Sequence, residues 1–360
     1  MKIAFASDLH LNKEKDWTLN VLRELVEKTK DFSNILILGG DLFDSFNDLI
    51  ALKDFFVSVV ENSPIEKVFF VPGNHDIKGG TLEDLSKINF GNKVFCFTKT
   101  PYSIVSFDGE ELEFLIIPFQ KDLLSLYNKD IDFSKRFRIV IGHGSIIDFK
   151  NDMEDENSFF DTEFFNLVNA KIVFLGHIHN SNLNQRKIER KIIYPGSARI
   201  WRKGEDGDHG FIVYDTKTDE IIFNKLESGG IYKRINIEIE KDNYFIDNSI
   251  FENLPKNCFL EIIFKGIVYS DNSIENIKGK IRQILEEKSI INKDDSSLFN
   301  TENVIKATNY YNLEIFKAFM EKWKNYYSNE TDEDEKENYL LARKLFIEEL
   351  SQFLIGGGEN

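Results

Sequence analysis

The residues best suited to chemistry in this 360-residue chain are its histidines, because five of the six occur in an ordered series of short motifs. These motifs are Asp8-Leu9-His10, Gly39-Gly40-Asp41-Leu42-Phe43-Asp44, Gly73-Asn74-His75-Asp76, Gly142-His143 and Gly176-His177-Ile178-His179. Imidazole and carboxylate side chains together bind divalent transition metals. The two cysteines, Cys96 and Cys258, lie far apart in apolar stretches and are expected to be buried small hydrophobes. The sequence therefore predicts a metal site with nitrogen and oxygen ligands.

The motifs differ in how strongly each one indicates metal binding. In the last motif, alternation would point His177 and His179 to the same side of an extended segment. A single Asp-x-His, Gly-Asp or Gly-Asn-His-Asp is weaker, because aspartate and asparagine also favour ordinary turns. For Asp76, a turn-stabilising role and a role in the site both stay open, and His209 reads as a loop residue. Jointly, the ordered motifs favour a metal site over a set of turns.

Two divalent ions can be assembled from these residues if one aspartate bridges them, which places the ions about 3.5–4 Å apart. The ions would then share a hydroxide, a nucleophile suited to attack on phosphorus near neutral pH. Imidazole, carboxylate and amide ligands suit manganese, iron or zinc better than magnesium alone.

Each motif comes directly after a short apolar run that is typical of a β-strand. The runs before the motifs are Lys2–Ala6, Ile35–Leu38, Val68–Val71, Arg138–Ile141 and Ile172–Leu175, and further strands are expected at Val94–Phe97, Phe114–Ile117, Ile192–Tyr194, Phe211–Tyr214 and Ile221–Phe223. Amphipathic helix patterns follow Asp16, which could cap the first helix, and cover Leu49–Val60. We therefore expect an α/β fold with a layered β-sandwich core flanked by helices. Loops at the carboxyl ends of strands are where such sheets place ligands, so the motifs can meet at one edge.

A domain boundary is expected near Ser228-Gly229-Gly230. Beyond it, strand patterns cover 232–240 and Phe259–Val268, and an amphipathic helix covers Ile274–Glu287, which together predict a small α+β unit. Helical patterns over Val304–Trp323 and Tyr339–Leu354 predict a helical tail. The expected domains are thus a core at 1–228, an α+β domain at 229–298 and the tail at 299–360.

The charge balance bears on the substrate. With 45 Lys and Arg against 61 Asp and Glu, the formal net charge is -16, whereas DNA-binding proteins usually present a basic surface. A nucleic-acid substrate would need a small basic patch, the metal ions or a partner subunit to supply the attraction.

The N-terminus reads as a strand and not as a signal segment, and no apolar stretch is long enough to span a bilayer. We therefore expect a cytoplasmic protein with no membrane contact.

The motif series resembles that of the calcineurin-like metallophosphoesterase superfamily, over the range from Asp8 to His179. The resemblance implies a phosphoesterase that uses a metal-bridging hydroxide. It implies that the first metal is held by Asp8, His10 and His179 and the second by Asn74, His143 and His177. It implies that Asp41 bridges the two metals. It further implies that His75 faces the substrate, where it stabilises charge or protonates the leaving oxygen, and that Asp44 orients His75.

A narrower resemblance lies in Tyr194-Pro195-Gly196-Ser197-Ala198-Arg199, which is followed by Glu205 and Gly210-Phe211. This segment is similar to the one after the last metal motif in SbcD-type DNA double-strand-break repair nucleases, which also carry Gly-Asp-Leu-Phe-Asp. The resemblance implies a manganese-dependent exo- and endonuclease subunit with a capping domain at 229–298. Its tail would bind an SMC-like, ABC-type ATPase of the SbcC type. Two readings stay open for Arg199 and Arg202, which either contact phosphates of the substrate or belong to an ordinary exposed basic cluster.

A homodimer is a further expectation from these relatives, in which the region after the second motif helps to form dimer helices or DNA contacts. Here that region reads Ser45-Phe46-Asn47-Asp48 in place of a proline-containing stretch. Two alternatives remain beside the nuclease. A phosphodiesterase for small substrates such as cyclic nucleotides shares the motifs and suits the acidic charge. A scaffold protein would use the metals only for stability and the tail as its interaction surface.

Overall fold

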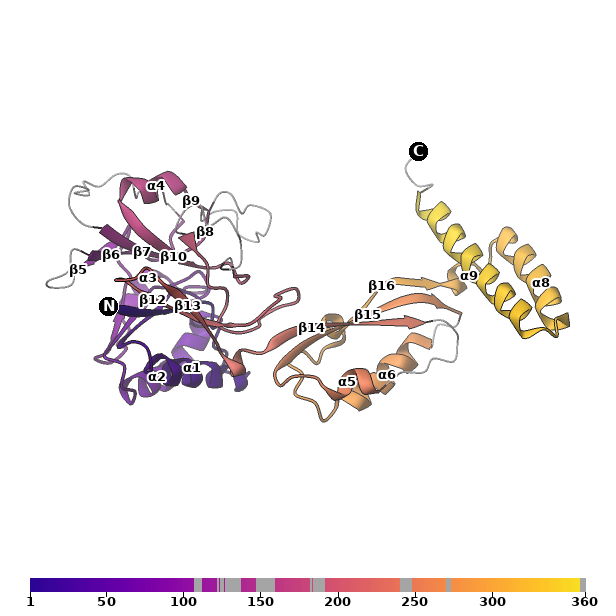
Figure 1. Ribbon diagram of the computed structural model, residues 1–360, viewed down its shortest axis with the longest axis horizontal. Helices are drawn as coiled ribbons and strands as arrows, with labels where there is room; N and C mark the ends of the chain where they lie inside the picture. Colours follow the sequence, from indigo (N-terminus) through magenta and orange to yellow (C-terminus); the bar gives the residue numbers. More distant parts are fainter. Residues whose placement is uncertain are drawn as a thin grey trace. The chain divides into compact units, whose positions relative to one another are not determined.

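The computed structural model describes residues 1–106, 112–121, 123, 126, 137–146, 159–181, 183, 192–239, 248–269 and 273–356. The chain divides into two compact units, Met1–Tyr232 and Lys233–Asn360. Figure 1 shows two stacked sheets with helices on their outer faces in the first unit. The second unit contains a smaller sheet with its own helices and a helical hairpin.

The first sheet of the N-terminal unit has six strands in the order β13-β12-β1-β2-β3-β4. Their bounds are β1 (Lys2–Ala6), β2 (Ile35–Leu38), β3 (Lys67–Phe70), β4 (Val94–Cys96), β12 (Gly210–Asp215) and β13 (Ile221–Lys225). Strands β1 to β4 are parallel, and β12 and β13 continue the sheet as antiparallel strands. The connecting helices are α1 (Trp17–Thr29), α2 (Phe46–Glu61) and α3 (Leu82–Ser86). Helix α1 begins beside Asp16 as expected, but the Asp16 side chain makes no capping hydrogen bond.

The second sheet has five strands in the order β11-β10-β7-β6-β5. Their bounds are β5 (Ser103–Ser106), β6 (Leu112–Ile117), β7 (Phe137–His143), β10 (Ala170–Gly176) and β11 (Ile192–Ile193). All neighbours are parallel except the antiparallel pair β5 and β6. Strands β8 (Ser145–Ile146) and β9 (Phe159–Phe160) form a separate pair, and α4 (Thr162–Leu167) precedes β10.

The core follows from the alternation of side chains along strands that are buried on both faces. In β1, Ile3 and Phe5 join the apolar cluster between the two sheets, and Ala4 and Ala6 pack with the residues of α1 and α2. Phe164 of α4 belongs to a third cluster, on the outer face of the second sheet. The expected α/β sandwich core flanked by helices is confirmed.

The C-terminal unit contains a three-stranded sheet in the order β14-β15-β16. Its elements are β14 (Ile231–Ile239), α5 (Ser249–Glu252), β15 (Cys258–Val268), α6 (Ser273–Leu285), α7 (Asp295–Leu298) and β16 (Phe299–Lys306), followed by α8 (Glu314–Asn329) and α9 (Glu333–Gly356). Ile277 and Ile281 of α6 are fully buried among the sheet residues. Phe316 of α8 and Ile347 of α9 pack with Ile267 of β15, so the helical hairpin rests on this small domain.

One helix in this unit was predicted wrongly. A helix was expected over Val304–Trp323, but residues 299–306 form β16, because they pair with β15 through Gly266 with Val304 and Ile267 with Ile305. The helix α8 starts only at Glu314. The division of this unit into a capping domain and a partner-binding tail stays a prediction. No helix in the described parts of the chain is both long enough and apolar enough to cross a bilayer.

Candidate metal centre

All seven expected ligands lie together at the carboxyl ends of strands from both sheets of the first unit. Asp8 and His10 follow β1, Asp41 follows β2, Asn74 follows β3, His143 ends β7, and His177 and His179 follow β10. The loops after β1 and β2 continue side by side beyond the sheet. The amide of Asp8 donates to the carbonyl of Gly40 at 3.0 Å, and the amide of His10 donates to the carbonyl of Asp41 at 2.9 Å. These bonds hold the two loops in register next to the site.

The backbone at the site is strained. Asp8, His10, Asp41 and His177 have φ values of 56°, 44°, 50° and 93°, in the left-handed region that non-glycine residues seldom occupy. Such conformations cost about 1–3 kcal/mol each, and they persist where the surrounding structure enforces them, commonly at functional sites. Gly40 also has a positive φ, and a Cβ atom there would lie 2.1 Å from His143 Nδ1. Glycine is therefore the residue that this loop can accommodate.

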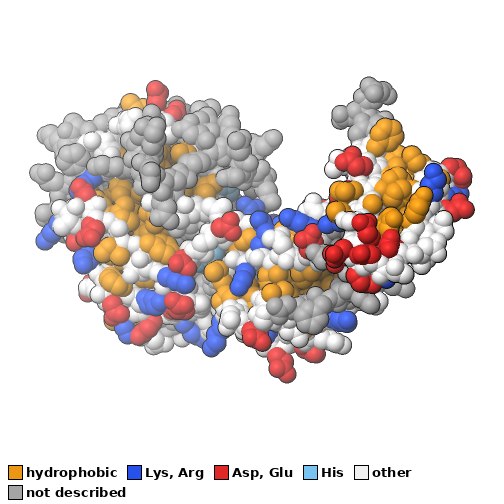
Figure 2. Space-filling view, turned by 45° about the vertical axis from the view of Figure 1, so that its right-hand side comes forward, with side chains coloured by type: hydrophobic (Ala, Val, Ile, Leu, Met, Phe, Trp, Pro, Cys, Tyr) orange, Lys and Arg blue, Asp and Glu red, His pale blue; other side chains and the backbone are white. Residues whose placement is uncertain are grey.

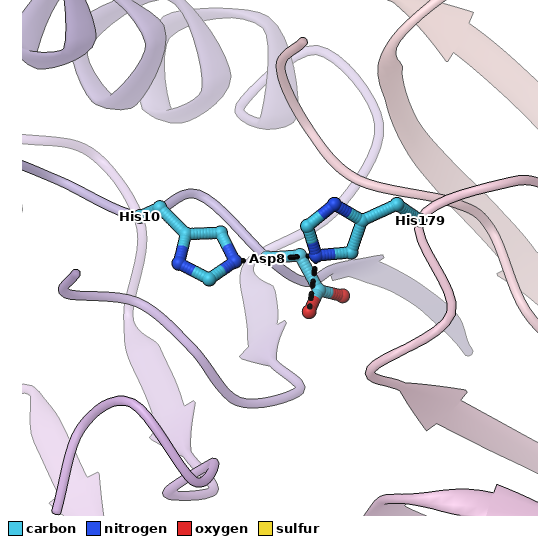
Figure 3. A group of neighbouring side chains, drawn as sticks. All are labelled: Asp8, His10 and His179. Atoms are coloured by element: carbon cyan, nitrogen blue, oxygen red, sulfur yellow. Dashed lines mark hydrogen bonds and ion pairs between the residues drawn. The ribbon is translucent and has the colours of Figure 1, made fainter. Parts of the chain in front are cut away.

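The first half-site consists of Asp8, His10 and His179, whose potential ligand atoms all lie within 4.8 Å of one another. His10 Nε2 and His179 Nε2 are 3.2 Å apart, and His179 Nε2 lies 3.6 Å from Asp8 Oδ1. Figure 3 shows both rings turned toward one another beside the Asp8 carboxylate. Burial lowers the pKa of His10 to about 4, so this imidazole is neutral at physiological pH. Two converging imidazole nitrogens and a carboxylate fit the donor set of a divalent transition metal.

The second half-site consists of Asn74, His143 and His177, with Asp41 beside them. Asn74 Oδ1 lies 3.0 Å from His143 Nε2 and 3.2 Å from His177 Nδ1. Asp41 Oδ2 lies 3.3 Å from His143 Nε2 and 3.9 Å from His10 Nε2, so it stands between the two half-sites. This is the position that a bridging carboxylate requires. The two groups are candidate ligand sets for two divalent ions, and the individual ligand roles stay predictions.

The Asp41 carboxylate dominates the electrostatics of the second half-site. Burial alone would lower the pKa of His143, but the nearby charge of Asp41 raises it to about 9. Burial likewise opposes ionisation of Asp41, yet His143 and His10 hold the pKa of Asp41 well below its usual range. Burial lowers the pKa of His177 to about 4. The buried Asp41 charge is thus balanced by a proton on His143, which a divalent cation could replace.

His75 lies beside both half-sites. Its amide donates to Asp41 Oδ1 at 2.8 Å, and its ring meets the His10 ring edge-on with the centroids 4.7 Å apart. His75 Nδ1 lies 3.0 Å from the backbone carbonyl oxygen of Asp44. Because a carbonyl oxygen only accepts hydrogen bonds, Nδ1 carries a hydrogen and Nε2 is the nitrogen left for proton transfer.

Asp44 supports the site differently from what was expected. Asp44 contacts His75 through its carbonyl oxygen, and its carboxylate lies beside His10. Asp44 Oδ1 lies 3.3 Å from His10 Nδ1 and accepts from Trp201 Nε1 at 3.2 Å, and Oδ2 accepts from Asn12 Nδ2 at 2.8 Å. The Asp44 carboxylate therefore orients His10, a candidate metal ligand.

Glu205 and Trp201 are site residues that the sequence reasoning did not assign. Glu205 Oε1 accepts from His179 Nδ1 at 2.5 Å, and Oε2 accepts from the amide of Trp201 at 2.6 Å and from that of Arg202 at 3.2 Å. A carboxylate behind a ligating histidine fixes its tautomer and its orientation. Glu205 was noticed only as part of the segment shared with the repair nucleases, because an acidic residue in a loop otherwise reads as solvated.

The two arginines expected to contact phosphate lie in different environments. Arg199 is only 1% exposed, and its guanidinium donates to the carbonyls of Leu9, Ile200 and His10 at 2.6, 2.8 and 2.6 Å. Arg199 is therefore a brace for the loop that carries His10, and the expectation of a phosphate contact at this residue is wrong. The Arg202 side chain is 44% exposed and lines the cavity at the site, so its expected contact remains open.

Asp76 and His209 are both buried. The Asp76 carboxylate accepts from the amides of Phe43 and Gly73, each at 2.8 Å, and so ties the second motif to the third. Of its two open roles, this structure shows the one that stabilises the turn. His209, expected to be a loop residue, is 3% exposed, and its Nδ1 lies 3.1 Å from Ser197 Oγ.

A cavity of about 240 Å³ opens beside the two half-sites. Its lining includes His75 and the histidines after β10, together with Trp201, Arg202 and Lys203. A group that enters the cavity would therefore meet both candidate metal ligands and basic side chains.

Comparisons with known proteins concern mainly the first unit. A family model described as calcineurin-like phosphoesterase matches residues 1–181, a range that contains all five motifs. No curated protein matches the chain at a significant level.

Three similar solved structures are all distant. A purple acid phosphatase from yellow lupin (Lupinus luteus) seeds is 14% identical, with a TM-score of 0.43 over 64% of this chain and 52% of that one. An archaeal phosphodiesterase is 18% identical, with a TM-score of 0.34 over 63% of this chain and 100% of that one. A dimetal phosphatase from Danio rerio is 10% identical, with a TM-score of 0.40 over 59% and 91%. The chain spans about half the length of the lupin enzyme.

Proposed function

Because the chain belongs to the calcineurin-like phosphoesterase family, and is on that ground a hydrolase, we propose that it is a dinuclear phosphodiesterase that cleaves DNA. The observation that carries the dinuclear assignment is the position of Asp41, 3.3 Å from His143 and 3.9 Å from His10. One carboxylate within reach of two ligand sets is what a pair of ions needs. Manganese is the metal that we propose, since the imidazole, carboxylate and amide donors admit it and the SbcD-type nucleases that the chain resembles use it.

The side chains around the two ions have separate tasks in this proposal. Bound ions would supply a nucleophile at neutral pH and offset the charge of the phosphate. His75 would donate a proton from Nε2 to the leaving oxygen, while Asp44 holds its Nδ1. Arg202 and Lys203, which line the same cavity, would attract the phosphate chain.

Support for DNA comes from the segment shared with the SbcD-type repair nucleases, Tyr194 to Arg199. This segment is built into the site. The amide of Ser197 donates to the carbonyl of His179 at 2.9 Å, and Arg199 braces the carbonyl of His10. The residues that carry the resemblance thus hold two candidate ligands in place. We therefore propose that the chain shares the nuclease chemistry of these relatives.

The partner that we propose is an SMC-like ATPase bound to the hairpin of α8 and α9. This hairpin exposes large apolar side chains, among them Leu341, Leu345 and Phe353, the last of which is 75% exposed. Figure 2 shows hydrophobic side chains gathered over the hairpin. An exposed apolar surface of this kind is a common feature of protein interaction sites. The homodimer stays a prediction.

A small-substrate phosphodiesterase is the second candidate. The formal charge of -16 favours it, because an acidic protein repels a long polyanion. The cavity of about 240 Å³ also favours it, since this volume lies below the roughly 300–1,000 Å³ of typical ligand pockets. The two candidates share the metal chemistry and differ in the length of the substrate.

The deciding experiment offers the protein linear duplex DNA, single-stranded DNA and bis(4-nitrophenyl) phosphate, each with manganese and with a chelator. We expect cleavage of DNA and of the aryl diester with manganese, and none with the chelator. Cleavage of the aryl diester alone would select the small-substrate enzyme. Two bound ions with no hydrolysis of any phosphodiester would contradict both candidates and favour the scaffold.

A further inference from the structure

Trp201 contacts three imidazole rings of the site. Its indole stacks on the His10 ring with the centroids 4.6 Å apart and an angle of 14° between the planes. It also meets the rings of His75 and His179 at 5.4 and 5.3 Å, at steep angles. One side chain therefore contacts both histidines of the first half-site and the histidine proposed to act on the leaving group.

Trp201 is itself held through both its indole and its backbone amide. Trp201 Nε1 donates to Asp44 Oδ1, the same oxygen that lies 3.3 Å from His10 Nδ1. The amide of Trp201 donates to Glu205 Oε2 at 2.6 Å, while Oε1 of that carboxylate accepts from His179 Nδ1. Trp201 thus contacts the carboxylates that orient both ligating rings, as well as the rings themselves.

This support is specific to the first half-site. Among the described aromatic contacts, the His143 ring meets His177 at 5.2 Å and Phe119 at 6.3 Å, both edge-on. An aromatic stack contributes about 0.5–1.5 kcal/mol beyond the burial of its area. Removing the partner that orients a ligating histidine typically lowers metal affinity about 10- to 100-fold.

We propose that Trp201 is a positioning residue that sets the affinity of the Asp8–His10–His179 half-site for its ion. The indole holds His10 with Nε2 directed toward His179 and covers this half-site on the side of the cavity. Its loss should leave the second half-site largely unaffected. The proposal rests on the two-ion reading of the proposed function and is independent of the substrate.

The test is a calorimetric titration of chelator-treated, dialysed full-length protein with manganese alone. The wild type should bind two ions. Trp201→Leu should weaken one of them about 10- to 100-fold and leave the other within about threefold. Trp201→Phe keeps an aromatic ring on His10 and should recover most of that loss. Trp323→Phe, in the C-terminal unit, is the matched control and should bind as the wild type does.

Tryptophan fluorescence provides a second readout that does not depend on activity. The chain has three tryptophans, and Trp201 is the one stacked on a candidate ligand. Manganese is paramagnetic, so its binding should quench the Trp201 emission. Trp201→Phe should lose most of the quenching, while Trp323→Phe should retain it. The Phe variant keeps this test available if the Leu variant does not fold.

Three outcomes are distinguishable. A wild type that does not bind two ions would contradict the proposed function itself. A wild type that binds two ions beside a Trp201→Leu protein of unchanged affinity would overturn only the role of Trp201. Equal weakening of both ions in a folded Trp201→Leu protein would also overturn it, because it would show a general structural effect.

Discussion

The two half-sites of the metal centre are held in different ways. In the first, carboxylates orient the rings: Glu205 behind His179 and Asp44 behind His10. In the second, the supporting group is backbone, since His143 Nδ1 lies 2.9 Å from the carbonyl oxygen of Gly39. A Cβ atom added to Gly40 or to Gly176 would lie 2.1 or 2.8 Å from the same His143 nitrogen. His143 of the second half-site is thus enclosed by main chain.

This difference indicates in which half-site the metal affinity can change without a change of fold. A carboxylate support can be replaced one residue at a time, so the affinity of the first half-site can change without a change of fold. A carbonyl support belongs to the strand ends of the sandwich, so altering it disturbs the packing of both sheets. We therefore expect mutations of the supports in the first half-site to change the affinity for its ion in graded steps. Mutations of the supports in the second half-site should lower both the affinity for its ion and the stability of the fold.

The largest effect should come from Asp41→Ala, which removes the one side chain shared by both half-sites. Both ions should be lost and hydrolysis should fall below detection, because each ligand set loses its common carboxylate. Metal analysis of the purified protein measures this. Asp54→Ala, at a carboxylate that is 92% exposed on α2, is the control and should keep both ions. Two ions per chain in Asp41→Ala would refute the bridging position.

His75→Ala should lower the rate of cleavage without loss of metal binding. His75 belongs to neither ligand set in the proposal, and general acid catalysis typically contributes about 10²- to 10⁴-fold to a rate. We expect kcat to fall within that range, with two ions still bound. Parallel metal analysis and kinetics on bis(4-nitrophenyl) phosphate measure both quantities. Full activity in this variant would contradict the role of His75 as the general acid.

Much of the centre could be predicted from the sequence because its ligands come from local motifs. Asp8, His10, His177 and His179 each follow an apolar run that had to be a strand, and parallel strands bring their carboxyl ends to one edge. Only the order of the motifs and the period of the strands were needed. The positive φ values of Asp8 and His10 were not visible in the sequence, because residue type alone does not indicate such strain.

The supports of the ligands could not be predicted, because they join residues far apart in the chain. Arg199 reaches the carbonyls of Leu9 and His10 across about 190 positions, and an arginine near a candidate site reads more readily as a phosphate contact. Glu205 is equally remote from the first motif. Strand β16 was missed for the same kind of reason, since its pairing with β15 overrides the helical pattern of its residues.

Gly40→Ala should break the second half-site through its backbone. The added Cβ would press on the His143 ring at a φ of 96°, which combines overpacking with strain. Each of these effects costs about 1–3 kcal/mol. We expect the free energy of unfolding to fall by about 2–4 kcal/mol and one ion to bind more weakly. Urea denaturation and manganese titration measure these changes. Gly204→Ala is a control at a similar φ of 86° with open space around the Cβ, which isolates the strain. Equal losses in both variants would show that contact with His143 is unimportant.

Glu205→Gln should produce the smallest change and the most selective one, because it alters a side-chain support of the first half-site. The amide can still accept from His179 Nδ1, but it lacks the negative charge that makes the imidazole a better ligand. It also presents N–H groups toward the backbone amides of Trp201 and Arg202, which now donate to the Glu205 carboxylate. We expect one ion to bind about tenfold more weakly, with the other ion unchanged. Manganese titration measures both affinities, with Glu220→Gln, at an exposed position beside β13, as the control. If Glu205→Gln weakened both ions alike, the two half-sites would share their supports, and the contrast between side-chain and backbone support would fail. A selective loss would show that a single carboxylate outside the ligand set tunes one ion of the pair.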